Sequence, residues 1–177
     1  MNRRLIEKAG RIRFFLMDLD GVLTDGRLYY HPDGSESKVF HVLDGHGIVL
    51  LREAGIKSGV LSGRTSKSAE FRIKELAMDE SRLGISDKLT EYEKLIRKLG
   101  VQEDETAYIG DDLPDLPVLK RVGLSLAVAN AVDRVKDQVD WVTKKGGGTG
   151  AVREAIDLIL SAREGDRKGN RVGFLKP

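Results

Sequence analysis

The sequence predicts an α/β fold built on a doubly wound, mostly parallel β-sheet. Short apolar runs alternate along the chain with helical segments, which is the pattern of parallel strands covered on both sides. Polar clusters follow several of these runs, and in this class of fold ligands bind beyond the carboxyl ends of the strands. At 177 residues the chain is long enough for one domain and short for two. We expect one domain over residues 1–163 and a polar tail over 164–177.

The predicted elements follow one another in regular order. A helix over 2–9 precedes a buried strand over 14–17, where four apolar residues stand together. Asp44 to Gly47 is interpreted as the turn and N-cap of the next helix. The remaining strands are expected over 56–61, 82–85, 106–109, 124–129 and 140–143, and the helices over 48–54, 67–77, 89–99, 132–138 and 151–163, with a helical turn over 116–120.

A β-hairpin is expected as an insertion between the first strand and the helix that follows it. Two β-rich runs, 27–31 and 37–42, flank a Pro-Asp-Gly turn, which is a strong hairpin signal. An α/β domain normally needs only a short loop here. Exposed Tyr and Val side chains would leave apolar surface and unpaired strand edges in a monomer. We expect this insertion, about 27–42, to fold over the site or to pair with another subunit.

Charge and composition narrow the function classes. Lys and Arg number 30 against 28 Asp and Glu, a net charge of +2 without a dense basic block, so no nucleic acid is expected as partner. The chain has no Cys, which leaves oxygen and imidazole as metal ligands and favours a hard cation. No signal core opens the chain, and no apolar run approaches the ~20 residues that span a bilayer. We expect a cytoplasmic protein with no membrane contact.

The end of the first strand carries the chemistry. Asp18 and Asp20 follow the apolar run, and Gly21 comes directly after them. Side chains two apart on an extended chain leave on one face, so the two carboxylates are expected close together. Two like charges at that distance need a cation or a proton. An isolated Asp-x-Asp pair would be interpreted as a simple polar strand end, since Asp is a common turn residue. The polar clusters later in the chain favour a functional site instead.

Later strand ends supply complementary groups. These are Ser62, Lys88, and Asp111 with Asp112 and Asp115. Several carboxylates with one lysine carry an excess of negative charge. We therefore expect a Mg²⁺ ion bound by carboxylates and waters, with a phosphate completing its coordination shell. Taken singly, the serine would be an ordinary helix N-cap and the lysine an ordinary surface charge.

The order and content of these strand ends resemble the haloacid dehalogenase superfamily of phosphatases. Within it, the chain is similar from 13 to 162 to the 3-deoxy-D-manno-octulosonate 8-phosphate phosphatases. The segments that carry this similarity are 21–26, 44–48, 63–64, 110–115 and 147–154. The resemblance implies a Rossmann-like domain without a separate cap domain, a homotetramer that pairs its hairpins, and hydrolysis of a sugar-acid phosphate in lipopolysaccharide precursor synthesis.

The resemblance also implies roles for the strand-end residues. Asp18 would attack phosphorus and carry an aspartyl phosphate, while Asp20 protonates the leaving sugar alkoxide and later takes a proton from water. Mg²⁺ would be bound by Asp18, the backbone carbonyl of Asp20 and Asp111. Lys88 would offset the remaining anionic charge and hold Asp18 as a carboxylate.

Phosphate and sugar recognition are implied at the strand end around position 62. Ser62 and the Gly63 amide would bind a phosphate oxygen. A sugar acid brings a carboxylate that prefers a guanidinium fork, so Arg64 is the first candidate to bind it. Phosphatases of nine-carbon sugar acids tend to carry Glu at this position, which makes Arg64 favour the eight-carbon substrate.

Five further residues are weaker candidates. Asp115 would position the lysine or a metal-bound water, or would cap the turn over 116–120, and the two interpretations have equal weight. For Asp112, two roles stay open: it would support the metal site or would be a solvated surface charge. For Asp25, His46 and Arg153, surface or capping roles weigh at least as much as a role in binding substrate.

Alternative functions stay open. One has the same chemistry and differs only in substrate: a phosphatase for a nine-carbon sugar acid 9-phosphate. Another is a catalytically decayed tetramerisation scaffold, because a fold does not guarantee an activity, although Asp18, Asp20, Lys88 and Asp111 are all present. A third is a phosphoacceptor receiver domain, in which the phosphorylated Asp lies on the third strand rather than the first. Repeated Mg²⁺-dependent turnover of an aryl phosphate would separate the phosphatase from the other two.

Overall fold

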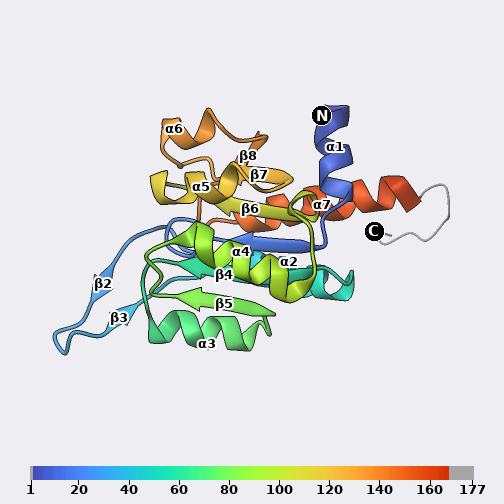
Figure 1. Cartoon of the computed structure of the whole chain (residues 1–177). Helices are drawn as coiled ribbons and strands as arrows, with labels where there is room; N and C mark the ends of the chain where they lie inside the picture. The colour runs from blue at the N-terminus through green and yellow to red at the C-terminus, as the bar shows by residue number, and fades with distance from the viewer. Residues whose placement is uncertain (1, 168–177) are drawn as a thin grey trace.

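A six-stranded parallel sheet forms the centre of the part of the chain that the computed structural model describes, residues 2–167 (Figure 1). The strand order is β5-β4-β1-β6-β7-β8, and every neighbouring pair is parallel. The strands are β1 (Phe14–Met17), β4 (Lys57–Ser62), β5 (Glu80–Leu83), β6 (Thr106–Gly110), β7 (Leu124–Ala127) and β8 (Trp141–Val142). The predicted doubly wound α/β fold is confirmed.

Helices cover both faces of this sheet. They are α1 (Arg3–Gly10), α2 (Val42–Glu53), α3 (Lys67–Glu75), α4 (Lys88–Leu99), α5 (Leu116–Leu119), α6 (Asp133–Lys136) and α7 (Ala151–Arg167), with short 3₁₀ turns η1 (Glu103–Glu105) and η2 (Leu113–Asp115). Helices α1 and α2 pack against α7, whereas α4 packs against α5 and crosses in front of the sheet in Figure 1. Among the described residues, no helix has the length and apolar character that crossing a bilayer requires.

Strand β1 lies in the middle of the core. All its side chains are buried, and it pairs with β4 on one side and β6 on the other. A strand buried on both faces needs a continuous apolar run, which the sequence provides here. The apolar side chains of both layers join in one cluster around it. Because β1, β4 and β6 are parallel, their carboxyl ends meet at one edge of the sheet.

Helix α2 begins at Val42, whereas the sequence predicted its start at 48. His41 is the N-cap, and its ring Nδ1 accepts the Leu43 amide at 3.3 Å. The predicted turn at 44–47 is therefore wrong, because these residues are helical. Gly45 lacks a side chain where the Arg72 guanidinium lies, 2.3 Å from the position that a Cβ would take. This glycine provides space for a neighbouring element rather than a turn.

The hairpin is shorter than predicted. Strands β2 (Tyr29–Tyr30) and β3 (Glu36–Ser37) form an antiparallel pair that projects from the body of the molecule (Figure 1). The second predicted arm, 37–42, leaves the sheet pairing after Ser37 and leads directly into α2. The insertion itself lies where the sequence predicted it.

Other helix and strand boundaries differ as well, most of them by one or two residues. β5 lies two positions earlier than predicted, at Glu80–Leu83. Helix α7 continues to Arg167, so the start of the predicted tail is helical. The rest of that predicted tail, 168–177, lies outside the described residues.

Candidate active site

Asp18 stands directly after β1 and is 8% exposed. Its Oδ1 accepts the Leu19 amide at 2.7 Å and lies 2.9 Å from Lys88 Nζ. Burial and the nearby Asp115 charge raise the pKa of Asp18 to about 6, although Lys88 acts in the opposite direction. The raised pKa shows that Lys88 offsets only part of the effect of burial and of the Asp115 charge.

Lys88 joins two of the strand ends. It is the first residue of α4, which Asp87 caps by accepting the Leu89 and Thr90 amides. Its ammonium donates to Asp115 Oδ1 at 2.7 Å besides contacting Asp18. Burial acts to lower the pKa of Lys88, but the two carboxylates outweigh it and the pKa lies above its ordinary value. The lysine is therefore a fixed cation between Asp18 and Asp115.

Asp115 is fully buried, and both of its carboxylate oxygens have partners. Oδ1 accepts Lys88 and the Tyr108 hydroxyl, the latter at 2.6 Å. Oδ2 accepts the amides of Asp111 and Asp112 at 2.9 and 3.2 Å. Asp115 makes no side-chain cap to the turn over 116–120, so that interpretation is wrong. Its contacts hold the lysine and the acidic loop after β6.

Asp112 lies at the surface and caps the short turn η2. Its Oδ1 accepts the Leu113 amide at 2.7 Å. The side chain is exposed, and this contact gives it a local structural role.

Three carboxylates form a cluster that suits a cation. Asp18, Asp111 and Asp115 each offer an oxygen within 4.8 Å of the others. Burial and the charge of Asp18 raise the pKa of Asp111 to about 8, because Lys88 does not offset all the negative charge. Oxygen donors alone suit a hard divalent cation such as Mg²⁺. Since hydrogen bonds already occupy Asp115, Asp18 and Asp111 are the better ligands.

Gly21 allows the two acidic loops to meet. Its φ is 90°, a left-handed value that favours glycine. A Cβ at this position would lie 2.1 Å from Asp111 Oδ2. The glycine after Asp20 therefore permits both the bend of the chain and the approach of Asp111.

The end of β4 brings a second set of predicted residues to the same edge. Ser62 is buried, and its Oγ accepts the Arg64 amide at 3.2 Å. Gly63 follows at the surface. The Arg64 guanidinium lies 3.5 Å from Asp20 Oδ2, so β1 and β4 place Asp20 and Arg64 side by side.

Comparison with known proteins identifies the family. A model of haloacid dehalogenase-like hydrolases matches residues 84–156. The 3-deoxy-D-manno-octulosonate 8-phosphate phosphatase of Escherichia coli K12 is 42% identical over 159 residues, which are 90% of this chain and 85% of that protein. The chain belongs to the 3-deoxy-D-manno-octulosonate 8-phosphate phosphatase family of haloacid dehalogenase-like hydrolases. The resemblance inferred from the sequence motifs is thereby confirmed.

Solved structures of this phosphatase family share the fold. The Yersinia pestis phosphatase superposes with a TM-score of 0.91 at 42% identity, over 93% of this chain and 89% of that one. The Moraxella catarrhalis phosphatase, solved with a magnesium ion, a phosphate ion and a KDO molecule, has a TM-score of 0.91 at 39% identity, over 96% and 97% of the two chains. The family resemblance therefore extends over nearly the whole described fold.

Three of the weaker candidates, Asp25, His46 and Arg153, make local contacts or lie at the surface. Asp25 accepts the Arg27 amide at 3.0 Å in the loop after β1. His46 is exposed on α2. The Arg153 guanidinium pairs with Asp157 at 2.8 Å on α7. These contacts fit the surface and capping roles that the sequence left open for all three.

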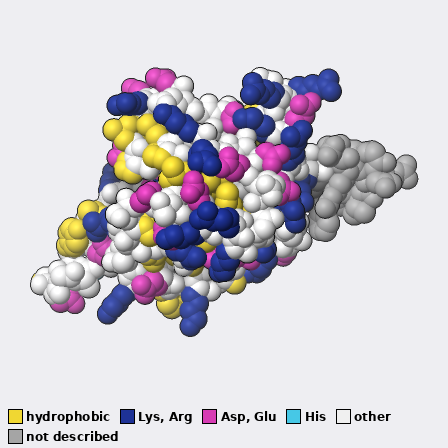
Figure 2. Space-filling view, viewed as in Figure 1, with side chains coloured by type: hydrophobic (Ala, Val, Ile, Leu, Met, Phe, Trp, Pro, Cys, Tyr) yellow, Lys and Arg dark blue, Asp and Glu magenta, His cyan; other side chains and the backbone are white. Residues whose placement is uncertain are grey.

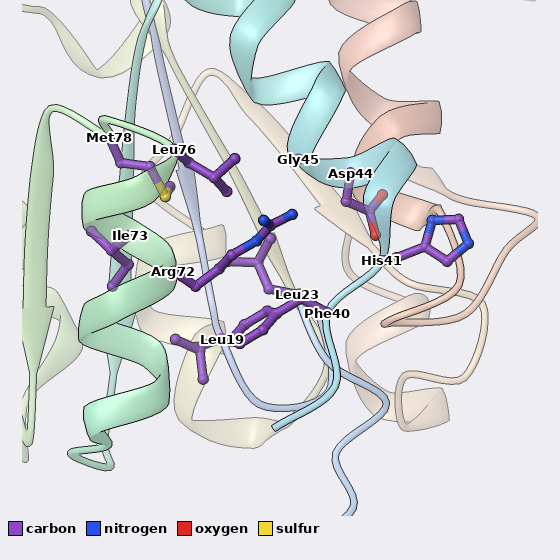
Figure 3. Close-up of a pocket in the computed structure, with 10 residues that line it drawn as sticks. All are labelled: Leu19, Leu23, Phe40, His41, Asp44, Gly45, Arg72, Ile73, Leu76 and Met78. Carbon is purple, nitrogen blue, oxygen red and sulfur yellow. The ribbon is translucent and has the colours of Figure 1, made fainter. Parts of the chain in front are cut away.

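A small cavity lies between α2 and α3 (Figure 3). Its volume of about 10 Å³ suits one water molecule and no substrate. Arg72 reaches across it, with its guanidinium carbon 5.9 Å from the centre of the Phe40 ring, a distance at which cation–π attraction operates. Asp44 lines the other side. The cavity is thus part of the packing beside the site and not a second ligand pocket.

Sequence reasoning missed several residues of the site region. Tyr108 lies in the apolar run of β6, where no pattern distinguishes a hydroxyl that bonds Asp115. Lys38 and Glu36 lie on the hairpin among other polar residues, yet they contact Asp20 and Arg64. Only the folded arrangement of hairpin and sheet brings them there.

Proposed function

We propose that this protein hydrolyses 3-deoxy-D-manno-octulosonate 8-phosphate to the free sugar acid and phosphate, with Mg²⁺, in lipopolysaccharide precursor synthesis. The observation that carries the proposal is the cluster of buried Asp18, Lys88 and Asp115 with partly buried Asp111 at one sheet edge. Family membership and the magnesium, phosphate and sugar acid in the Moraxella catarrhalis structure support it.

The reaction has two steps. One oxygen of Asp18 forms a bond to phosphorus while the bond between phosphorus and the sugar oxygen breaks, and Asp20 donates a proton to the leaving alkoxide. Asp20 then takes a proton from a water molecule, whose oxygen attacks the same phosphorus and releases phosphate and Asp18. Lys88 stays charged throughout and offsets the negative charge of the transferring group.

The acidic cluster fits the metal that the family implies. Asp18 and Asp111, with the backbone carbonyl of Asp20, would hold Mg²⁺. When bound, this ion supplies the positive charge that the raised pKa values of Asp18 and Asp111 call for. Asp115 stays with Lys88 and fixes the acidic loop.

Substrate recognition uses the end of β4. Ser62 and the Gly63 amide bind a phosphate oxygen, and Arg64 binds the carboxylate of the sugar acid. The position of Arg64 next to Asp20 supports this role, because the leaving oxygen that Asp20 protonates belongs to the same sugar.

The proposal includes a homotetramer in the cytoplasm, assembled through the hairpin. Apolar side chains gather on the hairpin around β2 (Figure 2). Tyr29 is 43% exposed and Tyr30 62% exposed, and an apolar projection of this kind is typical of a protein contact surface.

The decisive experiment replaces the nucleophile. Asp18→Asn keeps the shape of the side chain and removes its nucleophilic charge, so we expect kcat with this substrate to fall at least about a thousandfold. Phosphate release is measured in Mg²⁺ from eight- and nine-carbon sugar acid phosphates and from an aryl phosphate. The exposed acid Glu70→Gln is the control and keeps wild-type rates. Undiminished turnover by Asp18→Asn would refute the mechanism, and a preference for the nine-carbon substrate would refute the assigned substrate.

A further inference from the structure

Five side chains connect the base of the hairpin to the site. We call Asp20, Tyr30, Glu36, Lys38 and Arg64 the hairpin charge cluster. Two of them come from the strand ends of the sheet and three from the hairpin. The cluster thus joins the inserted hairpin to the catalytic Asp20 within one chain.

Arg64 already binds a carboxylate in this cluster. Its terminal nitrogen lies 2.8 Å from Glu36 Oε2 and donates to the Tyr30 hydroxyl at 3.3 Å. The Glu36 side chain is only 12% exposed, whereas Arg64 is 43% exposed. Arg64 is thus an anion-binding group that solvent can reach and that a carboxylate of its own chain, Glu36, already occupies.

Lys38 completes the charge balance. Its side chain is 1% exposed, its ammonium pairs with Asp20 Oδ1, and it lies 3.3 Å from Glu36 Oε1. Partial burial acts to raise the pKa of Glu36, but hydrogen bonds from Ser66 and Arg64 and the charge of Lys38 outweigh it and hold the pKa below its ordinary value. Two cations therefore face two carboxylates, and the cluster is neutral.

We infer that Glu36 is an internal competitor for the substrate's carboxylate, occupying Arg64 until a sugar acid displaces it. This inference rests on the proposed function, which gives Arg64 to that carboxylate. A binding group that is occupied part of the time lowers the apparent affinity for its ligand. Glu36 therefore raises KM for substrates with a carboxylate, and it helps the free sugar acid to leave, because that product carries the same group.

A purely structural role for Glu36 predicts the opposite result. If Glu36 served only to hold Arg64 in place, its loss would leave the guanidinium poorly oriented, and KM for the sugar acid phosphate would rise. The two roles therefore differ in the sign of the change in KM.

The test compares Glu36→Gln with the wild-type protein on two substrates. These are 3-deoxy-D-manno-octulosonate 8-phosphate and D-ribose 5-phosphate, which has a phosphate but no carboxylate. Removing one partner of a partly exposed ion pair changes affinity modestly, so we expect KM for the first to fall about threefold to fivefold. KM for the second should stay unchanged. Glu70→Gln, an exposed change of the same kind on α3, is the matched control and leaves both constants unchanged.

A second measurement does not depend on turnover. Isothermal titration calorimetry with the free sugar acid should show tighter binding to Glu36→Gln than to wild type by a similar factor. An unchanged or higher KM and dissociation constant, or an equal fall in KM for both substrates, would overturn the inference. If wild type shows no preference for the carboxylated substrate at all, the proposed function fails instead, which separates the two.

Discussion

At the residue scale, the site depends on which oxygen accepts which donor. Both oxygens of Asp115 accept donors from within the protein, namely Lys88, Tyr108 and two backbone amides. A carboxylate that is fully hydrogen-bonded in this way is a poor metal ligand and a good positioning group. This leaves Asp18 and Asp111 for a cation, although oxygens of all three residues lie within 4.8 Å of one another.

Asp44 is a second buried carboxylate with a positioning role. It lies in the first turn of α2, and its Oδ1 accepts the Arg153 amide at 2.7 Å in the first turn of α7. Desolvation raises the pKa of Asp44, although the Arg153 and Gly150 amides and the charges of His41 and Lys145 act against it. One helix is thus capped by a side chain of another, at the cost of a buried charge.

Asp44→Asn should change how stability depends on pH. A folded pKa above the unfolded one, about 4, means that the wild-type protein loses stability as the pH rises from about 4 through the folded pKa. Asn cannot ionise and keeps an acceptor oxygen for Arg153. The free energy of unfolding of Asp44→Asn, measured in urea, should therefore rise relative to wild type as the pH increases from about 4 to 7.

The control for this prediction is Asp33→Asn at the hairpin tip. Hydrogen bonds from Ser35 lower the pKa of Asp33, so its wild-type contribution grows as the pH rises to about 4 and is nearly constant from about pH 5 upward. Asp33→Asn should therefore show no rise in the free energy of unfolding relative to wild type between about pH 5 and 7. A difference between Asp44→Asn and wild type that stays constant from about pH 4 to 7 would contradict the buried charge.

At the scale of elements, loops rather than helices bring the two halves of the site together. The glycine loop after β8 packs on the turn after β1, where the Gly148 amide donates to the Val22 carbonyl at 3.0 Å. Gly147 donates to Asn130 Oδ1 at 2.8 Å. A Cβ on Gly147 would lie 1.7 Å from the Gly21 carbonyl oxygen. This close backbone contact fixes the turn that follows Asp20.

Gly147→Ala should disturb both stability and activity. The clash is with backbone, which cannot swing aside, so we expect a loss of about 3 kcal/mol in the free energy of unfolding and a large fall in kcat. Urea denaturation and phosphate release measure the two effects. Gly10→Ala is the control, because the nearest atom to a Cβ there is 3.8 Å away, and alanine in a helix is neutral or slightly stabilising. Wild-type behaviour of Gly147→Ala would show that this contact is unimportant.

At the scale of the whole molecule, the strand order decides where function lies. Strand β1 sits between β4 and β6, so segments far apart in the chain deliver Asp18, Ser62 and Asp111 to one edge. The hairpin leaves the body from that same edge of β1 and returns Lys38 to Asp20. The projection that we propose as the contact between subunits thus begins at the active site.

The oligomeric state tests that proposal. Light scattering of the wild-type protein should give about four times the chain mass of 19.6 kDa. The double variant Leu28→Ser, Tyr29→Ser removes two exposed apolar side chains of the hairpin, and we expect it to dissociate at micromolar concentration because association depends on buried apolar area. Val132→Ser, an equally exposed apolar change on another surface, should leave the assembly intact. A wild-type monomer, or a double variant that still forms tetramers, would contradict assembly through the hairpin.

Much of this fold could be predicted because its central strands are buried and are therefore visible in the sequence as short apolar runs. The run at 14–17 is apolar without interruption, as a central parallel strand must be, and Asp18, Lys88 and Asp111 follow predicted elements at recognisable spacings. The errors arose where tertiary contacts override local preference. Gly45 suggests a turn in the sequence, but it lies in a helix. Its lack of a side chain leaves space for the guanidinium of a neighbouring helix.

Local patterns were therefore enough to predict the alternation of strands and helices and the residue types able to transfer a phosphoryl group, and the resemblance of the motifs predicted the family that the comparisons show. The partners of those residues came only from the folded chain: Asp115 bound to Lys88, Asp44 at the start of α7, and Glu36 on Arg64. The physical reason is distance along the chain, because periodicity and turn chemistry act over a few residues, whereas these contacts join elements that only the packing of sheet, helices and hairpin brings together.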